Sequence, residues 1–263
     1  PRFSAVFSLV SSLGVILTRH IQGKIMTEVQ PMKMAAAEGL YETTSNAPFS
    51  VLSIGSLDGS EATRIIEIPG LLSFLATGTW DGEVEGINEL RVSERAMAEK
   101  VAEQYGPEVA ALVLVDDYTP MIPLAYWSFR FMMGLGFATM AAAAATLWAM
   151  RKNRVPQGSV WTWVAILTPL APVFANSWGW IFTEAGRQPW IVYGLMTTST
   201  GVSPSVSATE VWISMIAYTL VYAVLAVIEI KLFLTYVRRG ADPFEDPADH
   251  ADADEDAPLQ FAY

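Results

Sequence analysis

The chain has 263 residues, of which 52% are hydrophobic and only 16% are charged. Soluble domains carry about a quarter charged residues, so this composition excludes a soluble enzyme of ordinary type. The sequence has no cysteine and two histidines, which excludes zinc ribbons, iron–sulfur clusters, disulfide scaffolds and cysteine nucleophiles. The formal net charge of −11 argues against nucleic acid as a partner.

Four uncharged stretches approach or exceed the length that crosses a bilayer as a helix, which is about 20 residues. They cover residues 3–18, 131–150, 155–183 and 211–228, and the second can begin nearer Pro123 if Arg130 is tolerated inside it. We therefore predict an all-α integral membrane protein whose four transmembrane helices belong to a larger bundle. Buried helices of a soluble core are the alternative, but those should show a polar face.

Basic residues at the helix ends set the predicted orientation. Residues 151–154 read Arg-Lys-Asn-Arg, and the fourth helix ends in Arg238 and Arg239. The positive-inside rule places both sites in the cytoplasm, so the long segment after the first helix lies outside. The expected organisation is a transmembrane helix over 1–23, an external loop over 24–120, three transmembrane helices over 121–239, and an acidic, disordered cytoplasmic tail over 240–263.

The external loop is expected to have mixed secondary structure. Residues 48–54 and 63–68 alternate apolar and polar side chains around Asp58-Gly59, which predicts a β-hairpin. Residues 88–105 predict a helix with Asn88 as its N-cap and Gly106-Pro107 as its stop. The charged residues of this helix are expected to form a solvated face.

The start of the chain is unusual for a membrane protein. It begins Pro1-Arg2, without an initiator methionine or the layout of a signal peptide, directly before an apolar stretch. We expect it to be the C-terminal part of a longer membrane protein, whose missing N-terminal helices pack against these four.

Ionisable groups at membrane depth are costly, so each needs a partner or a purpose. Arg130 lies inside the second helix, where it either reaches the lipid headgroups or neutralises an acidic cofactor group such as a haem propionate. Met132 follows it closely. Most methionines in membrane helices only pack, but a thioether is also a ligand for ferrous haem.

Two further groups of polar residues lie near the predicted outer surface. Trp180 and Glu184 share a helix face, and Arg187 is three residues beyond Glu184. This set is either an aromatic belt with one ion pair, or a carboxylate that binds a metal or accepts a proton. A helix beginning near Pro31 would place Lys33 and Glu38 on neighbouring faces, where they could bind a polar ring and relay its protons.

Three motifs together resemble subunit I of the cytochrome bd quinol oxidase family. They are QPMKMAAAE at residues 30–38, FRFM at 129–132, and GRQPW at 186–190, the last preceded by Gly179-Trp180 and Glu184. Their order, their separation and the four-helix topology also fit. The resemblance covers nearly the whole chain up to the acidic tail.

The resemblance implies a haem-containing terminal oxidase that passes electrons from membrane quinol to dioxygen, forms water and separates charge across the membrane. The implied cofactors are a low-spin haem b, a high-spin haem b and haem d. The implied partners are quinol, dioxygen, cytochrome bd subunit II and the lipid bilayer of a prokaryotic plasma membrane. The external loop resembles the short form of the family's quinol loop.

The resemblance also implies roles for individual residues. Met132 corresponds to the axial methionine of the low-spin haem, with Arg130 supporting that haem. Lys33 and Glu38 match the pair associated with quinol oxidation.

At the end of the third helix, Glu184 corresponds to a ligand of one high-spin haem, with Trp180 beside it. Arg187 and Gln188 belong to the same haem environment. The family's histidine ligands are expected in the missing N-terminal helices, so this chain alone is expected to be inactive. A solute transporter and a non-catalytic assembly subunit are the alternatives. The sequence leaves open ubiquinol against menaquinol and haem d against an all-haem-b variant.

Overall fold

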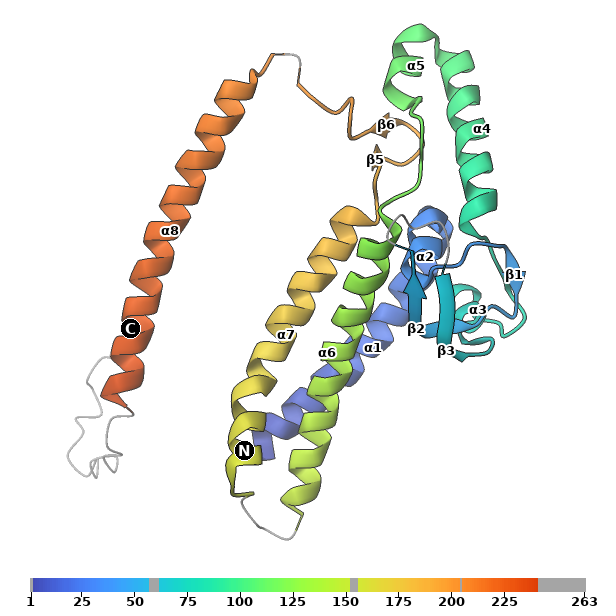
Figure 1. Ribbon diagram of the computed structural model, residues 1–263. Helices are drawn as coiled ribbons and strands as arrows, with labels where there is room; N and C mark the ends of the chain where they lie inside the picture. Colours follow the sequence, from blue (N-terminus) through green and yellow to red (C-terminus); the bar gives the residue numbers. More distant parts are fainter. Residues whose placement is uncertain (1, 57–61, 152–155, 204, 241–263) are drawn as a thin grey trace, which may run out of the picture. The chain divides into compact units, whose positions relative to one another are not determined.

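The computed structural model describes residues 2–56, 62–151, 156–203 and 205–240 (Figure 1). The chain divides into two units, residues 1–202 and 203–263, and each is described by itself. The predicted turn at Asp58-Gly59 and the predicted disordered tail after Gly240 lie outside the described residues.

Four helices are long and apolar enough to cross a membrane, which confirms the four predicted spans. They are α1 (Arg2–Val29), α6 (Ile122–Ala149), α7 (Ser159–Ala185) and α8 (Ala208–Arg239). Because α6 already begins at Ile122, Arg130 lies well inside the helix. Helix α1 continues to Val29, past the predicted boundary at residue 23.

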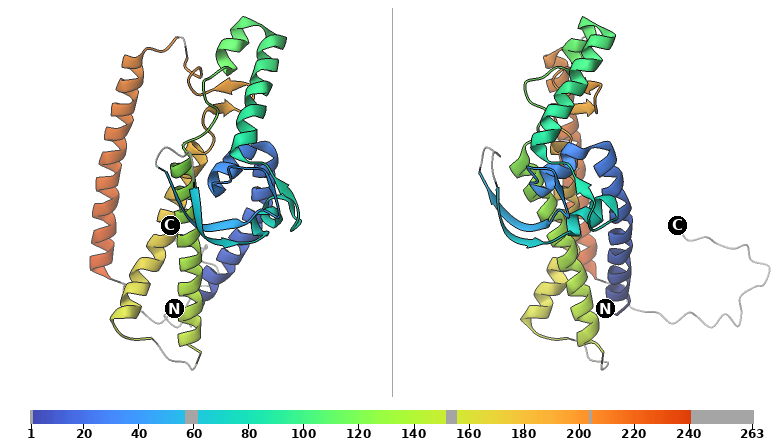
Figure 2. Two further views of the ribbon diagram at one scale, coloured as in Figure 1. Left: turned by 45° about the vertical axis from the view of Figure 1, so that its right-hand side comes forward. Right: turned by 90° about the vertical axis from the view of Figure 1, so that its right-hand side faces the viewer.

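Helices α1, α6 and α7 pack together in the first unit, with α6 in contact with both of the others (Figures 1 and 2). Residues 30–121 lie where α1 ends and α6 begins, and α7 ends at this same end of the bundle (Figure 1). We call it the loop end.

The loop end has mixed secondary structure, as predicted. Strands β2 (Phe49–Gly55) and β3 (Ala62–Ile68) pair antiparallel, which confirms the predicted hairpin. The segment after α7 forms a second, smaller hairpin from β5 (Trp190–Val192) and β6 (Met196–Thr197). The remaining elements are α2 (Pro31–Glu38), α3 (Leu71–Thr77), α4 (Ile87–Tyr105), α5 (Pro107–Val113), and the antiparallel pair β1 (Thr44–Ser45) and β4 (Glu83–Val84).

Helix α4 ends at Tyr105 with Gly106 as its C-cap, and Pro107 begins α5, as predicted. Its predicted N-cap was wrong, because the cap is Gly86 and not Asn88. The amides of Ile87 and Asn88 donate instead to the carbonyls of Leu40 and Tyr41, at 2.9 and 3.0 Å. Backbone carbonyls from the loop that follows α2 thus accept hydrogen bonds from the first amides of α4, where a capping side chain was expected.

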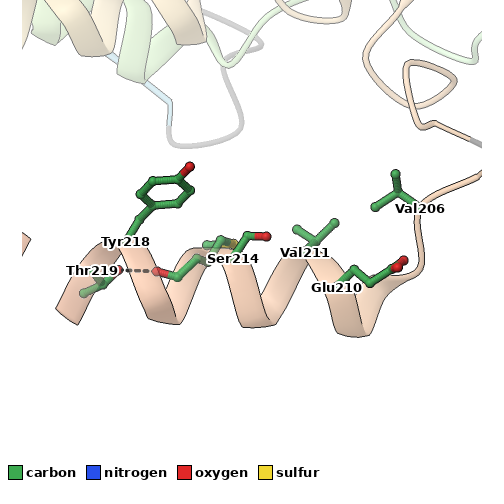
Figure 3. Close-up of a pocket in the computed structure, with 7 residues that line it drawn as sticks. Val206, Glu210, Val211, Ser214, Tyr218 and Thr219 are labelled. Carbon is green, nitrogen blue, oxygen red and sulfur yellow. Dashed lines mark hydrogen bonds between the residues drawn. The ribbon is translucent and has the colours of Figure 1, made fainter. Parts of the chain in front are cut away.

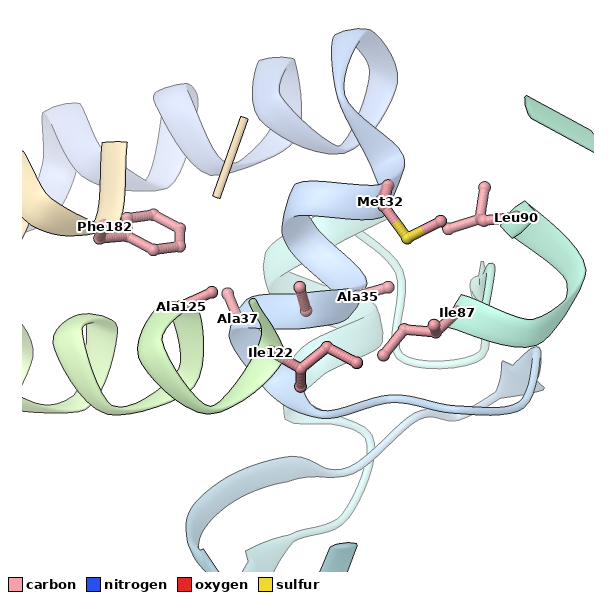
Figure 4. Close-up of a cluster of buried hydrophobic side chains, with 9 residues drawn as sticks. Met32, Ala35, Ala37, Ile87, Leu90, Ile122, Ala125 and Phe182 are labelled. Atoms are coloured by element: carbon pink, nitrogen blue, oxygen red, sulfur yellow. The ribbon is translucent and has the colours of Figure 1, made fainter. Parts of the chain in front are cut away.

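Helix α2 is the centre of the loop end, because every residue from Met32 to Glu38 is buried. Ala35, Ala36 and Ala37 are fully buried, and their small side chains let other helices approach closely. Figure 4 shows this cluster, in which α2 faces Ile87 and Leu90 of α4, Ile122 and Ala125 of α6, and Phe182 of α7. The same packing places Lys33 and Glu38, the two charged residues of α2.

The second unit contains α8. Its first turn is closed by a capping box in which Glu210 Oε2 accepts from the Ser207 amide at 2.8 Å, and Ser207 Oγ accepts from the Glu210 amide at 3.3 Å. Arg238 and Arg239 lie in the last turn, where cations interact favourably with the helix dipole. Figure 3 shows a shallow hollow along the start of α8, lined by Val206, Glu210, Val211, Ser214, Met215, Tyr218 and Thr219.

Candidate functional site

A buried ion pair joins α2 to α6. Arg130 Nη2 lies 2.7 Å from Glu38 Oε2, and Nη1 lies 3.3 Å from Oε1, so the contact is bidentate. The two side chains are 8% and 1% exposed. Arg130 therefore has a protein partner at this depth, and the structure does not show it reaching toward lipid headgroups.

The surroundings of this pair are both polar and aromatic. The Ser50 amide donates to Glu38 Oε2 at 3.4 Å. The Arg130 guanidinium lies over the rings of Phe49, Tyr126 and Phe129, at 4.8, 4.5 and 5.3 Å from their centroids. Burial raises the pKa of Glu38, and the positive charge of Arg130 opposes that rise. The carboxyl therefore holds a proton more readily than an exposed glutamate does.

Lys33 reaches a different helix. Its Nζ donates to the carbonyl of Thr183 at 3.3 Å and lies 5.1 Å from the centre of the Phe182 ring, both near the end of α7. Burial lowers the pKa of Lys33, and the nearby Glu184 carboxylate opposes that change. Lys33 and Glu38 were expected on neighbouring faces of the helix, whereas in the structure each contacts a different helix.

An ion pair forms at the end of α7, which is one of the two alternatives that the sequence left open. Arg187 Nη2 lies 2.6 Å from Glu184 Oε2, and the side chains are 36% and 43% exposed. Gln188 Nε2 donates to the Glu184 carbonyl at 3.4 Å. Trp180 lies one turn before Glu184 and is 68% exposed, so the described residues cover little of it.

Two of the sequence motifs meet between α6 and α7. A Cβ placed on Gly179 would lie 2.9 Å from the Met132 sulfur, so the thioether packs where α7 has no side chain. The neighbouring rings of Phe131 and Trp178 also pack across this contact, with centroids 4.9 Å apart. Met132 itself is half-buried.

Two buried polar atoms test whether a haem would fit. The Nε atoms of Arg130 and Arg187 are buried, and neither has a hydrogen-bond partner among the described residues. Buried donors without acceptors are uncommon, and an anionic oxygen such as that of a haem propionate would supply one for each. Within the described ranges, no three His, Asp or Glu side chains gather as a metal site of their own. The two unpaired Nε–H donors therefore suit a group that carries acidic oxygens.

One buried carboxylate was missed from the sequence. Glu94, on the α4 face predicted to be solvated, is 1% exposed. Its Oε2 accepts from Trp190 Nε1 at 3.0 Å, and its Oε1 accepts from the Tyr193 hydroxyl at 3.1 Å. Burial raises the pKa of Glu94, and these two hydrogen bonds oppose the rise.

A signal for Glu94 was present in the sequence. The buried positions of α4 are Ile87, Leu90, Glu94 and Ala98, spaced three or four residues apart along one face. A glutamate within an apolar stripe of this spacing indicates a buried carboxylate with specific partners. The prediction of a solvated face was wrong at this residue.

Comparison with known proteins is consistent with this geometry. A family model described as cytochrome bd terminal oxidase subunit I matches residues 2–241. Cytochrome bd ubiquinol oxidase subunit 1 of Bacillus subtilis (strain 168) is 35% identical over 243 residues, covering 92% of this chain and 48% of the relative. Cytochrome bd-II ubiquinol oxidase subunit 1 of Escherichia coli (strain K12) is 23% identical over 278 residues, covering 90% and 54%.

A solved structure is also similar. The bd oxidase from Geobacillus thermodenitrificans matches with a TM-score of 0.66 and 26% identity, over 91% of this chain and 49% of that one. The chain therefore spans about half the length of the relatives that it matches.

The ion pair between Glu38 and Arg130 predicts a specific pattern of stability. Arg130→Met should destabilise the loop end by about 3–5 kcal/mol, because it leaves a buried carboxylate without its cation. Adding Glu38→Gln should recover part of that loss, since the remaining side chain carries no charge. Thermal unfolding of the detergent-solubilised complex measures both effects.

Arg95→Met is the matched control, because the ion pair of Arg95 with Glu99 is 65% and 59% exposed. Exposed pairs of this kind contribute little, so this variant should unfold close to the parent protein. Equal destabilisation by Arg95→Met and Arg130→Met would contradict the prediction.

Proposed function

Because the chain belongs to the cytochrome bd terminal oxidase subunit I family, we propose that it acts in a haem-containing oxidase that oxidises membrane quinol and reduces dioxygen to water. One observation carries the proposal. Helix α2 contacts both helices that bear the candidate haem ligands, through Glu38 to Arg130 on α6 and through Lys33 to Thr183 on α7. The loop segment proposed to oxidise quinol is thereby packed directly against the proposed haem-binding helices.

Lys33 and Glu38 are the proposed quinol-oxidising pair. Oxidation of one quinol to the quinone releases two electrons and two protons, so proton acceptors must stand near its hydroxyls. The raised pKa of Glu38 makes its carboxylate a stronger proton acceptor than a glutamate in water, and the lowered pKa of Lys33 makes its ammonium a better proton donor. Glu38 is the proposed proton acceptor, and Lys33 is proposed to bind and orient a quinol oxygen.

The proposed haem-binding residues divide between the two helices. Met132 would be a ligand of a low-spin haem b, with the Arg130 Nε–H donating to an acidic group of that haem. Glu184 would be a ligand of a high-spin haem, either haem b or haem d, with Trp180, Arg187 and Gln188 around it. When bound, the haems would carry electrons one at a time and bind dioxygen.

The proposed setting is the plasma membrane of a prokaryote, in a complex with cytochrome bd subunit II. The loop end would face the outside, and Arg151, Arg238 and Arg239 would face the cytoplasm by the positive-inside rule. Quinol protons would then leave at the outer face. Protons for water formation would enter from the cytoplasm, so turnover would separate charge.

A reduced-minus-oxidised visible spectrum of the assembled complex tests the proposal. Low-spin haem b bands together with a far-red chlorin band are expected, and haem b bands alone would favour an all-haem-b oxidase. A well-assembled complex without haem would overturn the proposal and favour a transporter or an assembly subunit.

Met132→Leu should convert the low-spin haem to high-spin or remove it, because leucine keeps the bulk of methionine and cannot bind iron. Visible and electron paramagnetic resonance spectra of the complex measure the change. The control is Met133→Leu, at the adjacent half-buried methionine, which should keep the low-spin spectrum. An unchanged spectrum in Met132→Leu would refute the assignment.

Lys33→Met and Glu38→Gln should each slow quinol oxidation by about 100-fold, the usual size of a lost acid–base contribution. Reduction of oxygen with an artificial donor that bypasses the quinol site should change little. Lys100→Met and Glu99→Gln, at exposed residues of α4, are the matched controls. Equal loss with both donors would point to misfolding and would contradict a direct role in quinol oxidation.

A further inference from the structure

We propose that Glu94 is a positioning residue, which holds Trp190 and Tyr193 from helix α4 and so fixes the segment that carries Arg187 beside Lys33. The proposal deepens the function above, because it rests on Lys33 and Arg187 belonging to the reaction site. Helix α4 would thereby shape the site around Lys33 and Arg187 through the residues that it holds in place.

Within the described part of the chain, the Glu94 carboxylate accepts from two donors and has no cation beside it. Trp190 Nε1 bonds to one oxygen at 3.0 Å, and the Tyr193 hydroxyl bonds to the other at 3.1 Å. Among the described residues, no Lys, Arg or His nitrogen lies within 4.0 Å of either oxygen. The Glu94 carboxylate therefore uses its two oxygens to fix the positions of two aromatic side chains from the β5–β6 hairpin.

The hairpin is also fixed on its other side. The Trp190 ring is 3% exposed and stacks on Tyr118, with centroids 5.3 Å apart. The hydroxyls of Thr197 and Thr200 both donate to the carbonyl of Leu112 in α5, at 3.0 Å each. Contacts from α4, from α5 and from the segment after α5 thus all hold the hairpin.

Short bonds connect the hairpin to the proposed haem environment. The Trp190 amide donates to the Arg187 carbonyl at 3.0 Å. Gln188 accepts from the Thr198 hydroxyl at 2.7 Å and donates to the Glu184 carbonyl at 3.4 Å. A shift of the hairpin would therefore move the backbone at Arg187 and change the position of its side chain.

Trp190 and Tyr193 also line a small cavity together with Lys33 and Arg187. Its volume is about 10 Å³, close to what one water molecule needs. It is lined by Gln30, Met32, Lys33, Gly186, Arg187, Gln188, Trp190 and Tyr193. The same two aromatic residues thus contact Glu94 and form the wall beside Lys33 and Arg187.

The two hydrogen bonds of the Glu94 carboxylate allow a rescue experiment. Glutamine has the shape of glutamate, and its oxygen can accept from Trp190, which can only donate. Its amide can donate to Tyr193, because a hydroxyl can turn to accept. Leucine fills similar space but leaves both donors unpaired. A positioning role therefore predicts that Glu94→Gln is tolerated and that Glu94→Leu is not.

The test compares these variants in the assembled oxidase. In Glu94→Leu, the KM for quinol should rise about tenfold, as expected for lost buried hydrogen bonds, with kcat much less affected. The absorption of the high-spin haem should shift, and amide hydrogen exchange over residues 187–198 should become faster. Glu94→Gln should stay within about twofold of the parent KM and keep its spectrum and exchange rates. Glu99→Leu, on the exposed side of α4, should match the parent protein.

The outcomes separate this proposal from the proposed function. A parent complex without haem or quinol oxidation overturns the function, while the exchange measurement still tests whether Glu94 fixes the hairpin. In an active parent complex, parent-like behaviour of Glu94→Leu overturns the positioning role. A rise in KM in Glu94→Gln equal to that in Glu94→Leu also overturns it, because the charge or proton of Glu94 would then be what matters.

If Glu94→Leu does not assemble, Trp190→Phe tests the proposal instead. This variant removes one donor and should raise the KM for quinol about threefold, and an unchanged KM would refute the proposal.

Discussion

The buried contact between Glu38 and Arg130 is the constraint on which the loop end depends. Removing two charges from water costs several kcal/mol for each, so such a pair forms only where geometry and surroundings compensate. Here the contact is bidentate, Ser50 adds an amide donor, and aromatic rings face the guanidinium. A shift of α2 by one residue would leave both charges buried and unpaired, so the pair fixes its register against α6.

Once that register is fixed, the position of Lys33 follows from helix geometry. Lys33 and Glu38 are five residues apart, which turns their side chains about 140° from each other around the helix. A helix packed at the end of two others can therefore direct one charge to each of them. The small side chains of Ala35, Ala36 and Ala37 allow this, because larger ones would hold α6 and α7 too far away for both contacts.

The sequence predicted what depends on nearby residues. Uncharged runs of bilayer length predicted all four helices, and a spacing of three residues gave the ion pair of Glu184 with Arg187 as one of two alternatives. It did not predict the partner of Arg130, because Glu38 is 92 positions away and any loop carboxylate would have been an equal candidate. The cap of α4 was missed for the same reason, since backbone carbonyls of Leu40 and Tyr41 leave no trace in side-chain identity.

Two buried carboxylates join the loop to the rest of the first unit, and they differ in what they can specify. Glu38 is paired with the positive charge of Arg130. Loss of that partner would leave a buried charge uncompensated, and this cost in stability is large enough to fix the register of a helix. Glu94 is held by two neutral donors, so its hydrogen bonds orient the side chains of Trp190 and Tyr193 without pairing a buried charge with an opposite one. The first contact therefore places the loop on the bundle. The second adjusts the β5–β6 hairpin, and a change there can alter the surroundings of Arg187 and Lys33 while α2 stays in place.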